Sequence, residues 1–231
     1  HLLACGKDSK GRQQLVYSDE FSKTQAEVKF NRIEELFQKF DEIQAQNDKN
    51  RRSRSPRIKD NADCLKLIMM TGVRPGSDED TGAAVKAYGA TTLEGKHVVK
   101  TKDGVELQFV GKKGVSLSIK VEDKETANML IRRQKESGPD GKLFPLTSAK
   151  TLLAYTHTMD GGGFKTKDFR THLGTKTAME EIAKLPKPQN EKEYRKSVLA
   201  VAKTVSQKLG NTPTIALQAY INPVVFSGWR E

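Results

Sequence analysis

The sequence is poor in the residues that would tie a protein to a metal, a disulfide framework or a membrane. Its two cysteines, Cys5 and Cys64, form no Cys-x-x-Cys pair, so both are expected to be reduced packing residues in a cytosolic or nuclear setting. The four histidines are scattered, without acidic or cysteine neighbours at ligand spacing, which argues against a zinc site. No apolar run approaches the roughly 20 residues that a membrane helix needs. A glycine-rich loop for nucleotide phosphates is also missing.

What the sequence has in excess is positive charge. It carries 40 lysines and arginines against 29 aspartates and glutamates, a formal net charge of +11. Such an excess favours a polyanionic partner, because each phosphate that is neutralised releases condensed counterions. A soluble protein that happens to be basic is the alternative interpretation of the same composition.

The positive charge is densest over residues 49–59, which hold six basic residues and no acidic one. This composition does not predict a packed core. The segment fits a contact with a DNA backbone, a localisation signal or a solvated loop, and the sequence leaves these three open.

The apolar pattern divides the chain into a strand-rich start and a mostly helical remainder. A hairpin is expected over residues 1–17, and another within residues 90–121, with Lys112 and Lys113 between two glycines at its tip. Apolar spacing of three and four residues predicts helices. They are expected over residues 24–48, 60–71, 123–136, 148–158, 166–184, 191–209 and 213–221. The fold class is therefore α+β, a mostly helical domain with a small antiparallel sheet.

Two helix ends stand near a candidate functional residue. Asp60 or Asn61 is expected to cap the helix over residues 60–71, and Gly72 to end it. Pro75 cannot extend that helix but suits the first turn of a new element. Arg74 is therefore expected at a helix junction.

Two later helices also carry start signals. Asn190 and Glu193 form a capping box for the helix over residues 191–209. Thr212 as N-cap, with Pro213 in the first position, starts the helix that carries Tyr220.

Four side chains spread along the chain suit one chemistry, the attack of a phenol oxygen on a DNA phosphodiester. The attack keeps the bond energy in a covalent ester, for which Tyr220 supplies the phenol. Arg74 and Arg170 suit the non-bridging oxygens, because the planar guanidinium matches phosphate geometry and stays protonated. Lys112 is a credible general acid for the leaving oxygen. Taken alone, each residue is better explained as a surface arginine, a turn lysine or a half-buried tyrosine, and only their order and context favour the chemistry.

The order and local context of these residues resemble the catalytic region of type IB DNA topoisomerases of the compact bacterial and poxvirus kind. The resemblance covers nearly the whole chain, and residues 1–17 resemble the end of the family's amino-terminal strand domain. The matching motifs are Gly72-Val73-Arg74, Tyr88-Gly89-Ala90-Thr91-Thr92-Leu93 with His97-Val98, Phe109-Val110-Gly111-Lys112, Lys167-Asp168-Phe169-Arg170-Thr171, and Leu209-Gly210-Asn211-Thr212-Pro213 with Tyr220-Ile221.

The resemblance implies a role for each motif residue. Tyr220 would attack one strand and remain on its 3′ phosphate, while Lys112 protonates the departing 5′ oxygen. Arg74, Arg170 and Asn211 would hold the non-bridging oxygens. The residues implied to contact DNA elsewhere are Arg12, Gln14, Tyr17, Lys113 and Lys167. Rotation of the free 5′ end would then relax supercoils, with no metal and no nucleotide cofactor required.

Three departures from the family pattern bear on function. Asn211 stands where many members have histidine, which resembles the bacterial variant and puts no titratable group there. Leu15 occupies the place of a poxvirus tyrosine, so the poxvirus kind of target-sequence preference is not expected. Most of the amino-terminal clamp domain is missing from this sequence, which opens at His1 as a piece with its first strand under way, so DNA binding by this piece is expected to be weak.

The expected organisation follows from the resemblance. Residues 1–22 would be the remnant of the amino-terminal strand domain, and residues 23–231 the catalytic domain. The implied partner is double-stranded DNA, bound by a monomer without membrane contact. The implied location is the cytoplasm or nucleoid, or a nuclear or viral setting if the source is not a bacterium.

Two other functions fit part of the pattern. Tyrosine recombinases share the fold and the Arg–Lys–Arg–Tyr set, but their second arginine usually lies in a His-x-x-Arg box. Here that box begins with Lys167, and no histidine occupies the position of Asn211. A basic DNA-binding module without catalysis is the second alternative.

Overall fold

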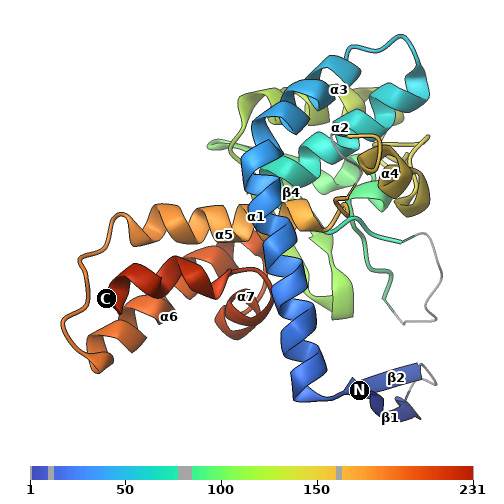
Figure 1. Cartoon of the computed structure of the whole chain (residues 1–231). Coiled ribbons are helices and arrows are strands. Elements are labelled where there is room, and N and C mark those ends of the chain that lie inside the picture. The colour runs from blue at the N-terminus through green and yellow to red at the C-terminus, as the bar shows by residue number, and fades with distance from the viewer. Residues whose placement is uncertain (1, 10–12, 78–84, 160–162, 231) are drawn as a thin grey trace. The chain divides into compact units, whose positions relative to one another are not determined.

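The computed structural model describes residues 2–9, 13–77, 85–159 and 163–230. The chain consists of two compact units, residues 1–38 and 39–231, and the division between them falls inside the long helix α1 (Asp19–Asn50) (Figure 1). The described elements are mostly helices with two small antiparallel sheets, so the predicted α+β class is confirmed.

The first unit contains the predicted hairpin. Strands β1 (Leu2–Lys7) and β2 (Gln13–Tyr17) pair antiparallel. The ring of Tyr17 stacks on that of Phe21 in the first turn of α1, with 4.9 Å between ring centroids. Ser18 accepts a hydrogen bond from the Phe21 amide, and two acidic residues follow it. These start signals explain why α1 begins five residues before the predicted residue 24.

The second helix of the chain, in the second unit, starts earlier than predicted. Helix α2 covers Pro56–Thr71, because Pro56 at its first position presets the helical φ angle. The prediction that Asp60 or Asn61 caps this helix is therefore wrong, since both are buried inside it. Its predicted end is confirmed: Gly72 adopts the left-handed conformation, and its amide donates to the Ile68 carbonyl.

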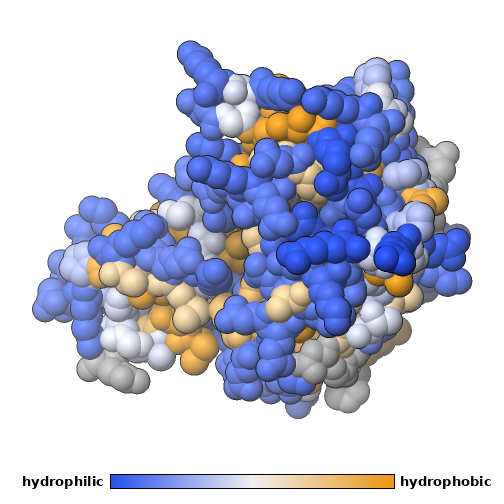
Figure 2. Space-filling model, turned by 90° about the horizontal axis from the view of Figure 1, so that it is seen from above, coloured by the Kyte–Doolittle hydropathy of each residue, from blue (hydrophilic) through white to orange (hydrophobic). Residues whose placement is uncertain are grey.

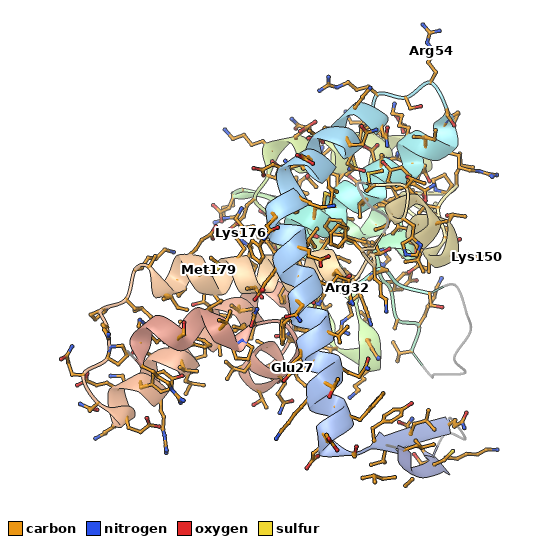
Figure 3. All side chains as sticks on the ribbon, in the orientation of Figure 1. Glu27, Arg32, Arg54, Lys150, Lys176 and Met179 are labelled. Carbon is orange, nitrogen blue, oxygen red and sulfur yellow. The ribbon has the colours of Figure 1, made fainter. Side chains whose placement is uncertain are left out.

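The basic segment 49–59 divides between the end of α1, a turn and the first turn of α2. Arg51 is not solvated, because it forms ion pairs with Asp48, Asp63 and Glu125. Arg54 is exposed and projects away from the two helices (Figure 3). Ion pairs thus hold Arg51 of this turn, whereas Arg54 is exposed to solvent. Contact of the turn with DNA remains a prediction.

The second sheet has three strands in the order β3 (Val98–Thr101), β4 (Gly104–Val110) and β5 (Ser116–Val121). Val105, Leu107 and Phe109 alternate along β4 and are buried, as a half-buried strand requires. The predicted hairpin is β4–β5, and its tip is a short 3₁₀ turn over Lys112–Gly114. Two 3₁₀ turns, Ala90–Thr92 and Gly95–His97, precede the sheet.

Five further helices follow, close to the predicted ranges. They are α3 (Lys124–Ser137), α4 (Ala149–Thr156), α5 (Asp168–Ile182), α6 (Glu191–Leu209) and α7 (Pro213–Ala219), and a 3₁₀ helix over Pro223–Trp229 follows α7. The predicted caps of α6 and α7 are confirmed, since Asn190 and Thr212 accept amide hydrogen bonds from the first turns. Helix α7 ends before Tyr220, which is its C-cap residue rather than an interior position.

Helices α5, α6 and α7 enclose a hydrophobic core (Figure 1). Its buried members are Ala178, Val201, Val205, Leu209, Ala216, Ile221 and Phe226. Ile221 and Phe226 belong to the segment after α7, so the chain on both sides of Tyr220 is packed into this core. The short helix α7 is thereby anchored by tertiary contacts rather than by its own length.

The polarity of the surface is seen on one face of the molecule (Figure 2). The face of the molecule in Figure 2 is mostly hydrophilic, with small apolar areas between charged ones. Within the described residues, every helix is too short or too polar to cross a membrane.

Candidate active site

Arg170 is the central residue of the candidate site. It lies in the first turn of α5 with 3% of its surface exposed. One terminal nitrogen donates to the Gly72 carbonyl at 2.5 Å, and the other donates to the Leu209 carbonyl at 2.9 Å. A single guanidinium therefore joins the ends of α2 and α6, the two segments that lead to Arg74 and Asn211.

The electrostatics of Arg170 link it to two of the other candidate residues, Tyr220 and Arg74. Burial lowers the pKa of Arg170 from its ordinary value, Tyr220 acts in the opposite direction, and the positive charge of Arg74 lowers it further. The guanidinium still stays protonated at any working pH. Because Arg74 and Tyr220 both act on this pKa, the three side chains share one electrostatic environment.

Tyr220 lies against Arg170. The guanidinium carbon is 4.6 Å from the centroid of the Tyr220 ring, which is cation–π geometry. The Tyr220 amide donates to the Ala216 carbonyl at 3.0 Å and so closes α7. The predicted nucleophile and the second predicted arginine are thus in contact.

Arg74 is held by its backbone. Its carbonyl accepts a hydrogen bond from the Ala90 amide at 2.8 Å, in the first 3₁₀ turn. A Cβ atom at Gly89 would lie 2.7 Å from that same carbonyl and would collide with Gly76, so glycine is needed for the close approach. The Tyr88–Leu93 motif therefore fixes the segment that carries Arg74.

The hairpin tip carries Lys112 and Lys113, and both side chains are exposed. Lys113 has a positive φ of 67°, in the left-handed region that few residues other than glycine adopt. The tip end of the hairpin packs on the segment before Asn211, because Leu117 fills the space that a Cβ at Gly111 or Gly210 would need, 2.6 Å away in each case. The hairpin that carries Lys112 is therefore packed against Gly210, the residue before Asn211.

Asn211 supplies the clearest sign of a missing partner. Among the described residues, neither the oxygen nor the nitrogen of its buried amide has a hydrogen-bond partner, and the same holds for the Nε of Arg170. Buried polar atoms are almost always paired, since an unmade hydrogen bond costs about 1–3 kcal/mol. Donors of this kind on two adjacent segments suit an anionic ligand.

The residues predicted to contact DNA are distributed between the units. Lys167 is exposed at the start of α5, three residues before Arg170. Gln14 and Tyr17 are exposed on the hairpin of the first unit, and Gln14 donates to Asp8 at 3.4 Å. Arg12 lies outside the described residues. Across the part of the chain that is described, no group of three potential metal-ligating side chains occurs.

Sequence reasoning missed two residues that contact Tyr220. A Cβ at Gly174 would lie 2.9 Å from the Tyr220 carbonyl oxygen and 3.0 Å from its Cβ. Thr175 donates to the same carbonyl at 2.9 Å. Their spacing of four and five residues after Arg170 was the available signal, since it places all three on neighbouring turns of α5.

Comparison with known proteins gives the class and the family. Residues 18–222 match the family described as eukaryotic DNA topoisomerase I, catalytic core. The DNA topoisomerase 1B of Acanthamoeba polyphaga mimivirus is 23% identical over 95% of this chain and 70% of its own length. The DNA topoisomerase 1B of Vaccinia virus (strain Copenhagen) is 26% identical over 59% of this chain and 43% of its own length. The DNA topoisomerase I of Monkeypox virus is 25% identical over the same shares.

The matched region gives the class of the protein: the DNA topoisomerases, which are isomerases. The chain belongs to the DNA topoisomerase I catalytic-core family, the type IB topoisomerases, as the resemblance of its motifs predicted. The predicted catalytic residues lie within the matched range 18–222: Arg74, Lys112, Arg170, Asn211 and Tyr220. The chain spans less than half the length of its vaccinia relative.

Proposed function

We propose that this chain relaxes supercoiled double-stranded DNA by transient single-strand cleavage and religation through a 3′-phosphotyrosyl intermediate, without ATP or a metal. The observation that carries the proposal is the Arg170–Tyr220 contact, 4.6 Å from guanidinium carbon to ring centroid. Asn211, whose amide has both polar atoms unpaired, follows two residues after the Leu209 carbonyl that Arg170 bonds. The Arg170–Tyr220 pair brings together a nucleophile and a phosphate ligand.

The cleavage step exchanges one phosphodiester for another. The Tyr220 oxygen attacks the phosphorus, the new P–O bond forms, and the bond from phosphorus to the 5′ oxygen breaks. The phenolic proton leaves to water. Lys112 gives a proton to the 5′ oxygen and regains one from water, so atoms and charges balance.

The two arginines and Asn211 stabilise the charge that grows on the non-bridging oxygens. Arg170 is preorganised for this, since two backbone carbonyls already fix its plane. Arg74 supplies the second guanidinium and Asn211 an amide donor. Lys167, exposed at the start of the same helix, helps to position the phosphate.

Resealing reverses the same step. The 5′ hydroxyl attacks the phosphotyrosyl ester, and Tyr220 leaves. No external energy source is needed, because the ester conserves the bond energy and the torque in the DNA drives rotation of the free end.

Two parts of the chain have different roles in this reaction. Residues 1–22, the end of a strand-rich domain, lie against DNA through Arg12, Gln14 and Tyr17. Residues 23–231 carry the chemistry, and Lys113 adds a phosphate contact beside the general acid. One copy of the chain contains every residue named here, so it works as a monomer.

Tyr220→Phe tests the proposal. The parent chain should relax plasmid in excess chelator and leave a covalent protein–DNA adduct on a denaturing gel. Tyr220→Phe should retain DNA binding and form no adduct. An adduct in the mutant would assign the nucleophile elsewhere. Strand exchange between two duplexes would indicate a tyrosine recombinase, and DNA binding without any adduct in the parent would indicate a non-catalytic module.

A further inference from the structure

We infer that Thr175 is a positioning residue for Tyr220: its buried hydroxyl fixes the end of α7 to α5, so that one helix holds both Arg170 and the tyrosine. The inference rests on the function proposed above, because it concerns how the attacking phenol is aimed. It assigns Thr175 no contact with DNA.

The Thr175 hydroxyl forms two hydrogen bonds with the segment that carries Tyr220. It donates to the Tyr220 carbonyl at 2.9 Å and accepts from the Asn222 amide at 3.2 Å. Thr175 is 3% exposed, so water does not compete for these bonds. The hydroxyl therefore holds residues 220–222 at both ends.

The hydrogen bond donated by Thr175 differs from those donated by other threonines in the helices of this chain. Thr71, Thr156 and Thr177 each donate to the carbonyl four residues earlier in their own helix, the usual bond of a helical threonine. Thr175 instead donates to the carbonyl of Tyr220, the C-cap residue of α7. A bond of this kind couples two elements rather than one turn.

Helix α7 needs such a bond. It has seven residues, and a helix of this length is marginal by itself. Tyr220 is its C-cap, with φ −128° and ψ −11°, where carbonyls lose their intrahelical partners. The Thr175 hydroxyl supplies the partner at the residue that carries the phenol.

Two other residues of α5 complete the contact. Arg170 lies over the Tyr220 ring, and Gly174 allows the Tyr220 carbonyl and Cβ to approach the helix closely. Ring, Cβ and carbonyl of Tyr220 are thus each fixed by α5. Because misplacing a reacting group by about 1 Å costs on the order of 100-fold in rate, the Thr175 bond should control cleavage.

Thr175→Val and Thr175→Ser form a matched pair, since valine keeps the shape and serine keeps the hydroxyl. Single-turnover adduct formation on a suicide duplex should fall about 10- to 100-fold in Thr175→Val and stay within about threefold of the parent in Thr175→Ser. Binding of the intact duplex, measured in a Tyr220→Phe background, should change by less than about twofold in both.

Thr177→Val is the control. It makes the same change on the same helix, at a residue that is 7% exposed and whose hydroxyl bonds within α5. It should cleave at the parent rate. Equal losses in Thr175→Val and Thr177→Val, or in Thr175→Val and Thr175→Ser, would overturn the inference.

Gly174→Ala covers the case in which Thr175→Val does not fold. It retains the hydroxyl but displaces the Tyr220 backbone, so slow cleavage with normal binding is expected and parent-like cleavage would count against the inference. If the parent forms no Tyr220-dependent adduct, the proposed function fails. If the parent forms one and Thr175→Val matches it, only the role of Thr175 fails.

Discussion

The guanidinium carbon of Arg170 lies 4.6 Å from the centroid of the Tyr220 ring, although fifty residues separate the two in sequence. The same guanidinium donates to the carbonyls of Gly72 and Leu209. One side chain thus contacts the C-terminal ends of three helices, α2, α6 and α7. The two residues that tyrosine-mediated cleavage would need together are already neighbours.

The first prediction separates the two lysines of the hairpin tip. Lys112→Ala should slow adduct formation about 10²- to 10⁴-fold, because the 5′ oxygen loses its general acid. Lys112→Ala should cleave a substrate with sulfur in place of that oxygen at close to the parent rate, because a thiolate leaves without a proton.

Lys113→Ala is the matched control, one residue away on the same exposed turn. It should weaken duplex binding a few-fold at low salt while cleavage of bound DNA is unchanged. A reversed pattern, with Lys113→Ala slow and rescued by sulfur, would make Lys113 the acid.

The second prediction concerns the unpaired amide of Asn211. Asn211→Ala should leave the free energy of unfolding unchanged or raise it by about 1 kcal/mol, because no hydrogen bond is lost. Adduct formation should fall about 10-fold or more, because a donor to the phosphate is lost. Urea unfolding and single-turnover cleavage measure the two effects.

Asn47→Ala provides the comparison for stability. The Asn47 amide is fully buried, donates to the Ala62 carbonyl at 2.9 Å and accepts from the Tyr155 hydroxyl at 2.7 Å. Its removal should cost about 1–3 kcal/mol. If Asn211→Ala destabilised the fold as much, its amide would be a structural group.

The third prediction concerns pH. Burial lowers the pKa of His172 from 6.5 to about 4, and the charge of Lys176 acts in the same direction. The unfolded chain therefore binds this proton at higher pH than the folded one. Stability should be complete above pH 6.5 and should fall by about 3 kcal/mol as the pH drops to 4.

His172→Phe tests this assignment, because phenylalanine keeps an aromatic ring against Phe40, which lies 4.2 Å from the His172 ring between centroids. The variant should show a smaller loss of stability between pH 6.5 and 4 in urea titrations. An identical slope in parent and variant would assign the pH dependence to other groups.

The fourth prediction concerns the buried ion pairs of the second unit. Asp63 is 1% exposed and pairs with Arg51 at 2.8 Å and Arg133 at 2.8 Å. Asp63→Ala should cost about 3–5 kcal/mol in thermal or urea unfolding, because the arginines lose a buried counter-charge. Asp103→Ala, at the exposed β3–β4 turn, should change stability by less than about 0.5 kcal/mol.

Local sequence was a good guide where local physics decides. Alternation predicted the β4–β5 hairpin, and the caps at Asn190 and Thr212 marked two helix starts correctly. The prediction of α2 from residue 60 starts four residues too late, because Pro56 lies in the basic segment 49–59, for which the composition predicts no packed core, although proline favours the first turn of a helix. The charge density of residues 49–59 also gave no indication that Arg51 is buried in ion pairs, because its partners Asp63 and Glu125 lie in other segments.

The sequence by itself determined which functional groups are available for the reaction. They are two arginines, a lysine, an asparagine and a tyrosine in a recognisable order, on elements of predictable type. Only the tertiary structure decided that Arg170 bonds the ends of α2 and α6, that the Asn211 amide is buried unpaired, and that Thr175 fastens the Tyr220 carbonyl. The physical reason is the separation in sequence over which each kind of interaction acts. Capping and periodicity act within a few residues, whereas these contacts join residues 39 to 98 positions apart, which only packing brings together.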